Sequence, residues 1–582
     1  MRLLLAILFV AAPAFAESEG ERLHALFSRE WEYAMRESPL WASTLGDRRY
    51  NDRWDDRGLA ALERRRAHSA ELLEELGRFD EAKLSPADRV NYRLFRHEYT
   101  ESLERHGFRL HFLQIDQRGG PQSTDEYVDS LRYETVKDYE DWAARLEAFP
   151  AYLEQITEVL REGARTKVLH PRFVLERVPE QIRARILDEP EKSRFYEPFK
   201  RMPADWAPEV RERLAARGAA AVREGVVPAF KRFLEFFEKE YLPAASPEAG
   251  LRRLPRGLEA YAFLARSFTT TPMTPPQIHA LGLSEVKRIR AEMETVKEAS
   301  GFKGSLRDYM DHLRTDPRYF YNDPEALLAG YRAIAKRIDP EMTKLFGKLP
   351  RAPYGVVPIP AESAPHTTTA YYWEPAADGS RAGAYYVNLY KPETRPKWEM
   401  EALTVHEAVP GHHMQISLAQ ELGELPKFRR YGGYTAFVEG WGLYSESLGY
   451  EIGLYQDPAS KFGQLAYEMW RAVRLVVDTG IHHYGWSREK VIDYFRENTP
   501  KTEIDIANET DRYVVMPGQA LAYKVGQLKI KALREKAKAE LGDKFDLRSF
   551  HDAVLSQGAV TLDVLEAVVD DWLSARKRIS TP

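Results

Sequence analysis

The stretch Glu401–Gln415 of this chain, EALTVHEAVPGHHMQ, carries the residue types that bind and use a divalent metal. His406, His412 and His413 supply imidazoles, and Glu407 supplies a carboxylate. Imidazole nitrogen and carboxylate oxygen are zinc ligands, and a carboxylate beside the first ligand can act as a general base. The stretch therefore predicts a zinc-hydrolase site.

The spacing of these histidines is longer than in the H-E-x-x-H motif, where two histidines four residues apart share one helical face. In an unbroken helix His412 would be rotated by about 240° from His406, and His413 would lie about 10.5 Å further along the axis. Pro410 cannot donate to the carbonyl of His406, and Gly411 permits unusual dihedral angles. We therefore expect a kinked or bulged helix that brings His412, or alternatively His413, beside His406.

A His-Glu pair is also typical of a solvent-exposed helical face, so further motifs must support the metal site. The chain contains two, VEGWGLYSE at 438–446 and MPGQALAYKVG at 516–526. Together with HEAVPGHH at 406–413, they resemble the bacterial domain-of-unknown-function 885 family over nearly the whole chain. Members of that family look like distant relatives of the helical zinc peptidases of the thimet oligopeptidase, neurolysin and angiotensin-converting-enzyme type.

The resemblance implies a mainly α, two-lobed, zinc-peptidase-like helical body with a deep cleft around the metal. In those peptidases the third zinc ligand is a glutamate on a later helix, which implies Glu439 here, 27 residues after His412 (439 − 412). The implied cofactor is one Zn²⁺ held by His406, His412 and Glu439, with His413 as the alternative to His412.

The chemistry of such a site assigns roles to further residues. Zinc held by three protein groups keeps a position for water, lowers the pKa of that water toward 7 and polarises a carbonyl. Glu407 is the natural base, which would take the proton of the water and return it to the leaving amine. Tyr523, or Tyr513, could stabilise the oxyanion, although a chain with 31 tyrosines uses most of them for packing.

Several charged residues after the second motif could complete the site. Asp478 and His482 lie four residues apart on one predicted helical face, which indicates either a catalytic role for His482 or a structural hydrogen bond. Arg474, Arg512 or Lys524 could bind the carboxylate at one end of a peptide. The sequence does not choose among these three cations.

Apolar residues at three- and four-residue spacing predict helices through most of the chain. The exception is the region 352–390, in which 367–373 and 384–390 have β-strand composition and flank a turn-forming segment at 377–380. We expect a small β-hairpin or sheet next to the zinc helix. In the peptidases that the chain resembles, an edge strand there pairs with the substrate, which implies Tyr386 and Asn388 as substrate contacts; a purely structural sheet is the alternative.

Residues 1–16 have a basic start, an apolar run and a small-x-small end, the pattern of a cleaved secretory signal peptide. The chain has no cysteine, which excludes a lipoprotein anchor, disulfides and thiolate zinc ligands. Export without disulfides favours the periplasm.

A Pro- and Gly-rich stretch at 243–257 is the expected boundary between two lobes of one cooperative unit. The first is an N-terminal helical lobe, 17–250, and the second is a C-terminal zinc-binding catalytic lobe, 251–582.

Composition limits the classes of molecule with which the protein is expected to interact. A net charge of −5 with 30% charged residues argues against a nucleic-acid surface, and no stretch after the signal peptide predicts stable membrane insertion. The sequence thus predicts a zinc metallopeptidase-like hydrolase that cleaves short peptides rather than folded proteins. The alternatives are a zinc amidohydrolase or esterase acting on cell-wall fragments or N-acyl amino acids, and a non-catalytic zinc-dependent binding protein. The sequence specifies no oligomeric state.

Overall fold

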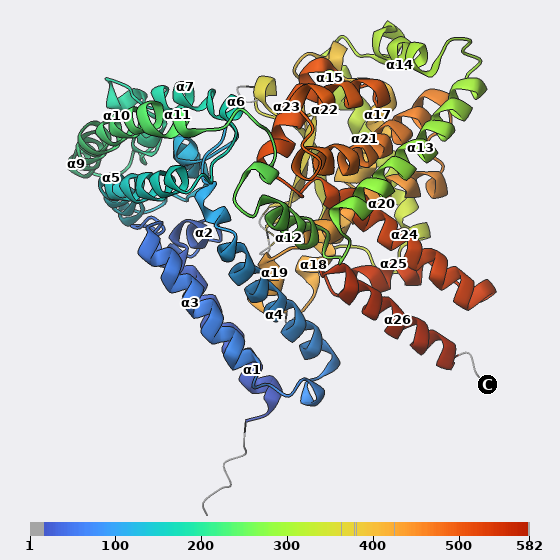
Figure 1. The fold of residues 1–582 in the computed structure, drawn as a ribbon, viewed down its shortest axis with the longest axis horizontal. Coiled ribbons are helices and arrows are strands. Elements are labelled where there is room, and N and C mark those ends of the chain that lie inside the picture. Colours follow the sequence, from blue (N-terminus) through green and yellow to red (C-terminus); the bar gives the residue numbers. More distant parts are fainter. Residues whose placement is uncertain (1–16, 362–363, 377–378, 380, 424, 580–582) are drawn as a thin grey trace, which may run out of the picture.

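The computed structural model describes residues 17–579 except 362–363, 377–378, 380 and 424. The predicted signal peptide and most of the turn predicted at 377–380 lie outside these residues. Helices make up most of the described chain, as the sequence predicts, and one small sheet lies among them (Figure 1). No helix in the described part is both long and apolar enough to cross a bilayer.

The helices fall into three consecutive groups along the chain. The helices of the first 250 residues are α1 (Glu19–Glu37), α2 (Pro39–Thr44), α3 (Leu59–Leu76), α4 (Pro86–Gly107), α5 (Val136–Arg165), α6 (Arg172–Leu175), α7 (Val178–Arg183), α8 (Glu197–Lys200), α9 (Pro208–Ala220), α10 (Val227–Phe236) and α11 (Leu242–Ala244). The helices before the sheet are α12 (Gly257–Thr269), α13 (Pro275–Ala299), α14 (Leu306–Thr315), α15 (Pro324–Ile338) and α16 (Met342–Leu345). The helices after the sheet are α17 (Lys397–Glu407), α18 (His412–Glu421), α19 (Lys427–Tyr431), α20 (Thr435–Leu448), α21 (Pro458–His482), α22 (Arg488–Asn498), α23 (Glu503–Val515), α24 (Leu521–Leu541), α25 (Leu547–Leu555) and α26 (Leu562–Ile579).

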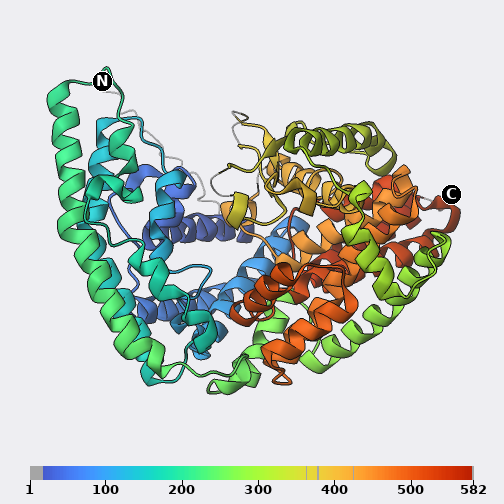
Figure 2. The same cartoon turned by 90° about the horizontal axis from the view of Figure 1, so that it is seen from above.

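Helices of the first 250 residues lie on one side of the molecule and helices of the last 250 on the other (Figure 2). The largest cluster of buried apolar side chains draws on both groups. It contains Phe149 and Phe230 from α5 and α10 together with Val476 from α21. A second cluster packs α17, α20 and α24 against the sheet, and it includes Val405 and Trp441. The residues that flank the candidate metal ligands therefore lie in the second cluster.

The helix α21 is the central support of the second half of the chain. Asp457 caps its N-terminus by accepting from two backbone N–H groups, and Pro458 occupies the first helical position. Nearly every residue from there to His482 is buried. Because α13, α17 and α24 pack on α21, it is apolar or internally paired on all sides.

The sheet has three strands, β1 (Tyr354–Pro358), β2 (Ala370–Trp373) and β3 (Gly383–Val387), in the order β1-β3-β2. The predicted antiparallel pair is confirmed as β2 and β3. The expectation that the strand at 385–390 offers a free edge to a substrate is wrong. β1 lies within the predicted β region at 352–390 but outside the two expected strands, and it pairs in parallel with the other side of β3, so β3 is the central strand.

The helices α20 and α24 cross at two glycines. A Cβ atom on Gly526 would lie 1.8 Å from the carbonyl oxygen of Ala436, and a Cβ atom on Gly440 would lie 2.6 Å from Cα of Gly526. The two backbones therefore touch, which only glycine permits. Tyr523 lies three residues before Gly526, one helical turn along α24 from this crossing, and Gly440 directly follows Glu439.

We predict that Gly526→Ala lowers the thermal and urea unfolding midpoints. The added methyl group meets backbone that cannot move without separating α20 from α24, and overpacking of this kind costs about 1–3 kcal/mol or more. Gly107→Ala in α4 is the matched control, because its added methyl group meets nothing within 4 Å. Equal midpoints for Gly526→Ala and the unaltered protein would contradict the crossing.

Candidate metal centre

The histidine motif lies at the junction of two helices. α17 ends at Glu407 and α18 begins at His412, so the expected kinked helix is in fact interrupted by four non-helical residues. A Cβ atom on Gly411 would lie 1.9 Å from the carbonyl oxygen of His406. The chain therefore folds back tightly against the end of α17, and glycine is required for this close approach.

The junction is attached to α20 through one carbonyl group. Nε1 of Trp441 donates to the carbonyl oxygen of Pro410 at 2.8 Å, and Oγ of Ser445 donates to the same oxygen at 3.3 Å. Both donors are buried side chains of α20. Because Glu439 belongs to the same helix, these bonds set the position of the histidines relative to that carboxylate.

Three side chains converge at the junction. Nε2 of His406 and Nε2 of His412 lie 3.6 and 3.5 Å from Oε2 of Glu439. One ligand atom from each of the three residues lies within 4.8 Å of the others. Two ligands at zinc distances of about 2.0–2.1 Å and a tetrahedral angle are roughly 3.4 Å apart, so the two histidine-to-glutamate distances match those between ligands of one ion.

The imidazoles are packed against a small residue of α20. A Cβ atom on Gly442 would lie 3.0 Å from Nε2 of His406 and 3.2 Å from Cε1 of His412. The absence of a side chain at 442 leaves room for both rings one turn after Glu439. The side chain of Glu439 is 22% exposed, whereas His406 is almost fully buried, so the group of three opens toward solvent at the carboxylate.

A second carboxylate orients the first histidine. Nδ1 of His406 donates to Oε1 of Glu446 at 2.8 Å, and Nη2 of Arg471 lies 3.5 Å from the same oxygen. A proton held at Nδ1 leaves Nε2 as the nitrogen that faces Glu439 and that binds either a second proton or a metal ion. Burial lowers the pKa of His406, but its bonds to Glu439 and Glu446 outweigh burial and raise the pKa to about 9.

The second histidine is oriented by an amide. The side-chain nitrogen of Gln415 lies 3.0 Å from Nδ1 of His412 and donates to the carbonyl oxygen of Val438 at 2.8 Å. Val438 immediately precedes Glu439. Burial raises the pKa of Glu439, but bonds to both histidines outweigh it and hold the pKa well below its usual range.

His413 points away from this group. Its Nδ1 accepts from the hydroxyl of Tyr372 at 2.8 Å, and its Nε2 donates to the carbonyl oxygen of Ala352 at 3.1 Å. Its ring also lies 4.7 Å from that of Tyr354, centroid to centroid. His413 therefore joins α18 to the sheet, and burial lowers its pKa to about 4. Of the two candidates for the second ligand, the structure places His412 beside His406.

Glu407, the predicted base, is the last residue of α17 and is partly buried. Its carboxylate has no hydrogen-bond partner among the described residues. Glu407 directly follows His406 in the chain, and its negative charge contributes to the raised pKa of that histidine. A carboxylate next to the first ligand and without a bond of its own is available to accept a proton.

The structure separates the two candidate tyrosines. The hydroxyl of Tyr513 donates to Glu509 and accepts from Nε of Arg474 at 2.7 Å, so it is fully used. The hydroxyl of Tyr523 accepts a long bond of 3.4 Å from Arg512, and its own proton has no acceptor in the described part of the chain. Tyr523 is therefore the phenol with a free donor.

His482 is held by the main chain on both sides. Leu251 donates its N–H to Nδ1 at 3.0 Å, and Nε2 donates to the carbonyl oxygen of Tyr513 at 2.9 Å. The predicted partner Asp478 instead accepts from the hydroxyl of Tyr261 and the N–H of Gly518. Burial lowers the pKa of His482 to about 4. The structure does not bring His482 into contact with the group of three.

The predicted substrate contacts of β3 lie on or beside the sheet. Tyr386 stacks on Tyr371 of β2 with 4.9 Å between ring centroids. Asn388 is almost fully buried, and its amide nitrogen donates to three carbonyl groups between Ala364 and Thr368. The side chain of Asn388 thus closes a loop rather than facing solvent.

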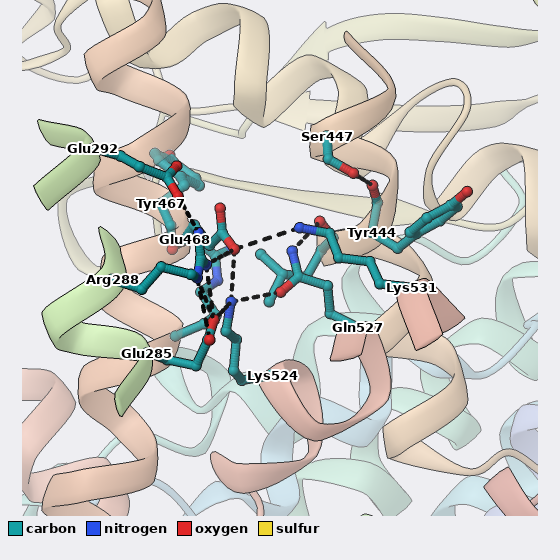
Figure 3. A network of polar contacts seen from close by, with 12 residues as sticks. Glu285, Arg288, Glu292, Tyr444, Ser447, Tyr467, Glu468, Lys524, Gln527 and Lys531 are labelled. Atoms are coloured by element: carbon teal, nitrogen blue, oxygen red, sulfur yellow. Dashed lines mark hydrogen bonds and ion pairs between the residues drawn. The ribbon is translucent and has the colours of Figure 1, made fainter. Parts of the chain in front are cut away.

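Lys524 belongs to a buried network, shown in Figure 3. Its ammonium group lies 2.7 Å from Glu468 and 2.9 Å from Glu285, and it donates to the amide oxygen of Gln527 at 2.8 Å. Arg288 contacts the same Glu468 oxygen at 2.8 Å. All three donors of the ammonium group are used, so Lys524 holds α13, α21 and α24 together and has none left for a substrate.

The sequence analysis assigned no role to Glu446, Gln415, Glu509 or Arg471, all of which orient or neutralise predicted site residues. A signal for Glu446 was present, since it lies seven residues after Glu439 and therefore on the same helical face. The contacts of Arg471 with Glu446 and of Glu509 with Arg474 join residues 25 and 35 positions apart, and no local spacing indicates them.

No curated protein matches the chain. Two solved structures are similar to it over almost their entire length. That of "the putative lipoprotein from Colwellia psychrerythraea" is 30% identical, with a TM-score of 0.89, covering 96% of this chain and 100% of that one. That of "a putative lipoprotein of unknown function from Shewanella oneidensis" is 18% identical, with a TM-score of 0.73, covering 94% of this chain and 99% of that one, which shows a shared fold.

The family described as "Bacterial protein of unknown function (DUF885)" matches residues 39–569. This match includes the three motifs on which the resemblance rests, at 406–413, 438–446 and 516–526, and it spans both predicted lobes. The chain therefore belongs to the DUF885 family.

Proposed function

We propose that this chain is a zinc-dependent, metallopeptidase-like hydrolase that cleaves the peptide bonds of short peptides. The observation that carries the proposal is the convergence of His406, His412 and Glu439 next to the unpaired carboxylate of Glu407. Two nitrogen ligands and one oxygen ligand with an open fourth position are typical of catalytic zinc.

A purely structural metal site is a poorer explanation of the same residues. Structural zinc has four protein ligands, whereas the cluster contains three within the described residues. Such a site also has no use for a further carboxylate, that of Glu407, which lies beside a ligand and makes no hydrogen bond within the described residues. The position and freedom of Glu407 therefore support catalysis.

In this proposal each residue has one task. Zinc supplies Lewis acidity, which lowers the pKa of water and polarises the scissile carbonyl. Glu446 keeps the proton of His406 on Nδ1 and leaves Nε2 free as a ligand. Glu407 accepts a proton from the attacking water and returns it to the leaving amine. The free hydroxyl of Tyr523 donates to the oxygen that becomes negative.

The substrate and location are part of the proposal. A cleft between the helices of 17–250 and those of 251–582 would admit short extended peptides and exclude folded proteins. The sheet would bind a peptide main chain through an edge strand, β1 or β2, because β3 is paired on both sides. The neighbours' description as lipoproteins and the signal-like residues 1–16 support a periplasmic location.

Digestion of a mixed peptide pool tests the function, with products identified by mass spectrometry in the presence and absence of a chelator. We expect short peptides to be cleaved and the chelator to stop cleavage. Intact peptides alongside consumption of N-acyl amino acids or cell-wall fragments would instead support the amidohydrolase alternative. No turnover of any amide or ester would contradict a hydrolase.

We predict that His406→Ala, His412→Ala and Glu439→Ala each lose most bound zinc, because two ligands hold the ion far more weakly than three. His413→Ala is the matched control, since that imidazole bonds to Tyr372 and Ala352 instead. It should retain about one zinc per chain. Elemental analysis after dialysis measures this, and zinc lost from His413→Ala but kept by His412→Ala would reverse the assignment.

We predict that Glu407→Gln reduces turnover by about a hundredfold or more while zinc content is unchanged, because the amide keeps the shape of the side chain but accepts no proton. Glu393→Gln, an exposed carboxylate elsewhere on the surface, should leave turnover unchanged. Peptide cleavage rates and zinc content of both variants decide the role. If the Glu407→Gln variant keeps more than about 1% of the activity of the unaltered protein, Glu407 is not the general base.

We predict that Glu446→Gln weakens zinc binding by about 10–100-fold, the usual effect of removing the carboxylate behind a histidine ligand. The substitution also leaves the buried guanidinium group of Arg471 without its carboxylate partner, so the thermal unfolding midpoint should fall. Competition with a chromogenic chelator measures the affinity. Glu451→Gln, which removes a more exposed partner of Arg534, should bind zinc normally, and equal affinities in the two variants would exclude an orienting role for Glu446.

A further inference from the structure

A group of charged and phenolic side chains lies on α21, α23 and α24, and we call it the arginine cluster: Arg474, Glu509, Arg512, Tyr513 and Tyr523. Nη2 of Arg474 lies 2.9 Å from Oε2 of Glu509, and Nη1 of Arg512 lies 3.4 Å from Oε1 of the same carboxylate. One carboxylate is therefore shared by two guanidinium groups.

The arginine cluster contains two positive charges and one negative charge. Both arginines are charged at any physiological pH, and Glu509 supplies a single negative charge. Tyr513 stays neutral, since burial raises the pKa of its phenol well above the usual value. Arg474 is 3% exposed, and an excess charge at such depth is costly unless a counter-charge is present.

The two arginines also have buried donors without partners. Nη1 of Arg474 and Nε of Arg512 make no hydrogen bond within the described part of the chain. The other donors of Arg512 reach Gln519 at 2.9 Å and, weakly, Tyr523 at 3.4 Å. Buried donors in proteins are nearly always paired, so an acceptor from outside the chain would satisfy both the charge and the hydrogen bonds.

The cluster is linked to the candidate metal centre by two series of contacts. Through α24, Tyr523 lies one turn from the glycine crossing beside Glu439. Through α21, the guanidinium groups of Arg474 and Arg471 lie 4.6 and 5.1 Å from the ring centroid of Trp470. Arg471 in turn contacts Glu446, the carboxylate that orients His406.

Neighbouring cations are already neutralised by carboxylates of the chain. Arg471 contacts Glu446, and the ammonium group of Lys501 lies 3.0 Å from Glu399. Lys524 contacts both Glu285 and Glu468. Arg474 and Arg512 differ from these described cations because they share one carboxylate, which leaves one positive charge unmatched. Arg512, at 18% side-chain exposure, is more accessible than Arg474.

We propose that the arginine cluster binds a carboxylate of the substrate, with Arg512 as the residue that contacts it and Arg474 as the second positive charge. The proposal rests on the proposed function in taking the substrate to be a peptide. A guanidinium group can bind a carboxylate through two parallel hydrogen bonds, which makes it selective for that group. The carboxylate is the C-terminus of the peptide or an acidic side chain at its last position.

Binding of three forms of one pentapeptide tests this: the free acid, the C-terminal amide, and the amide with glutamate at the last position. The protein is the zinc-loaded Glu407→Gln variant, in which the peptides remain intact, and titration calorimetry gives the affinities. We expect the free acid to bind at least about tenfold more tightly than the plain amide, the usual effect of a hydrogen bond to a charged group.

The glutamate-containing amide identifies the source of the carboxylate. Affinity equal to that of the free acid supports the cluster as a site for an acidic side chain, and affinity equal to that of the plain amide supports recognition of the C-terminus. Equal affinity for all three peptides overturns the proposal.

Substitution of Arg512 locates the site. In the Glu407→Gln background, Arg512→Gln should remove the preference for the acid. Arg496→Gln should keep it, because Arg496 lies on the surface of α22 and pairs with Glu503. A preference that survives Arg512→Gln overturns the assignment. If Arg512→Gln does not fold, the comparison of peptides on the protein with Arg512 intact still decides whether a carboxylate is recognised.

The same peptides separate this inference from the proposed function. Zinc-loaded protein with Glu407 intact should cleave the free acid faster than the amide. Preferential binding of the acid without cleavage leaves the carboxylate site standing and contradicts the hydrolase. Cleavage at equal rates, with equal binding, supports the hydrolase and overturns the carboxylate site.

Discussion

The carbonyl oxygen of Pro410 is the contact on which the candidate metal centre depends. It receives hydrogen bonds from Trp441 and Ser445, and so it ties the junction between α17 and α18 to the helix that carries Glu439. Without this link the two histidines would be joined to α20 only through the hydrogen bonds of Glu446 and Gln415. A rigid attachment matters because metal ligands must be held in position before the ion binds.

Around that junction, each candidate ligand is oriented by a different element. Glu446 of α20 holds His406, and Gln415 of α18 bridges His412 to the main chain beside Glu439. The glycine crossing of α20 with α24 brings Tyr523 to the same region. The sheet contributes indirectly, because it sequesters His413 through Tyr372 and leaves the other histidine to face Glu439.

Two consecutive residues of α24 contact buried charges that are balanced in different ways. Lys524 is surrounded by Glu285, Glu468 and an amide oxygen, and it acts as a structural cross-link (Figure 3). Its neighbour Tyr523 instead faces two guanidinium groups that share a single carboxylate. Complete neutralisation favours a rigid framework, whereas an unmatched charge next to a candidate active site favours binding of an anion.

The helical class, the β-strand composition near residue 370 and the candidate ligand types follow from local patterns, and the family follows from three motifs. Local patterns do not determine which imidazole lies beside His406. That depends on a break in the helix and on the hydrogen bonds of His413 with Tyr372 and with the carbonyl of Ala352. The central position of β3 and the free hydroxyl of Tyr523 likewise depend on contacts between distant segments. Sequence spacing encodes the faces of single elements, but only packing decides which faces meet.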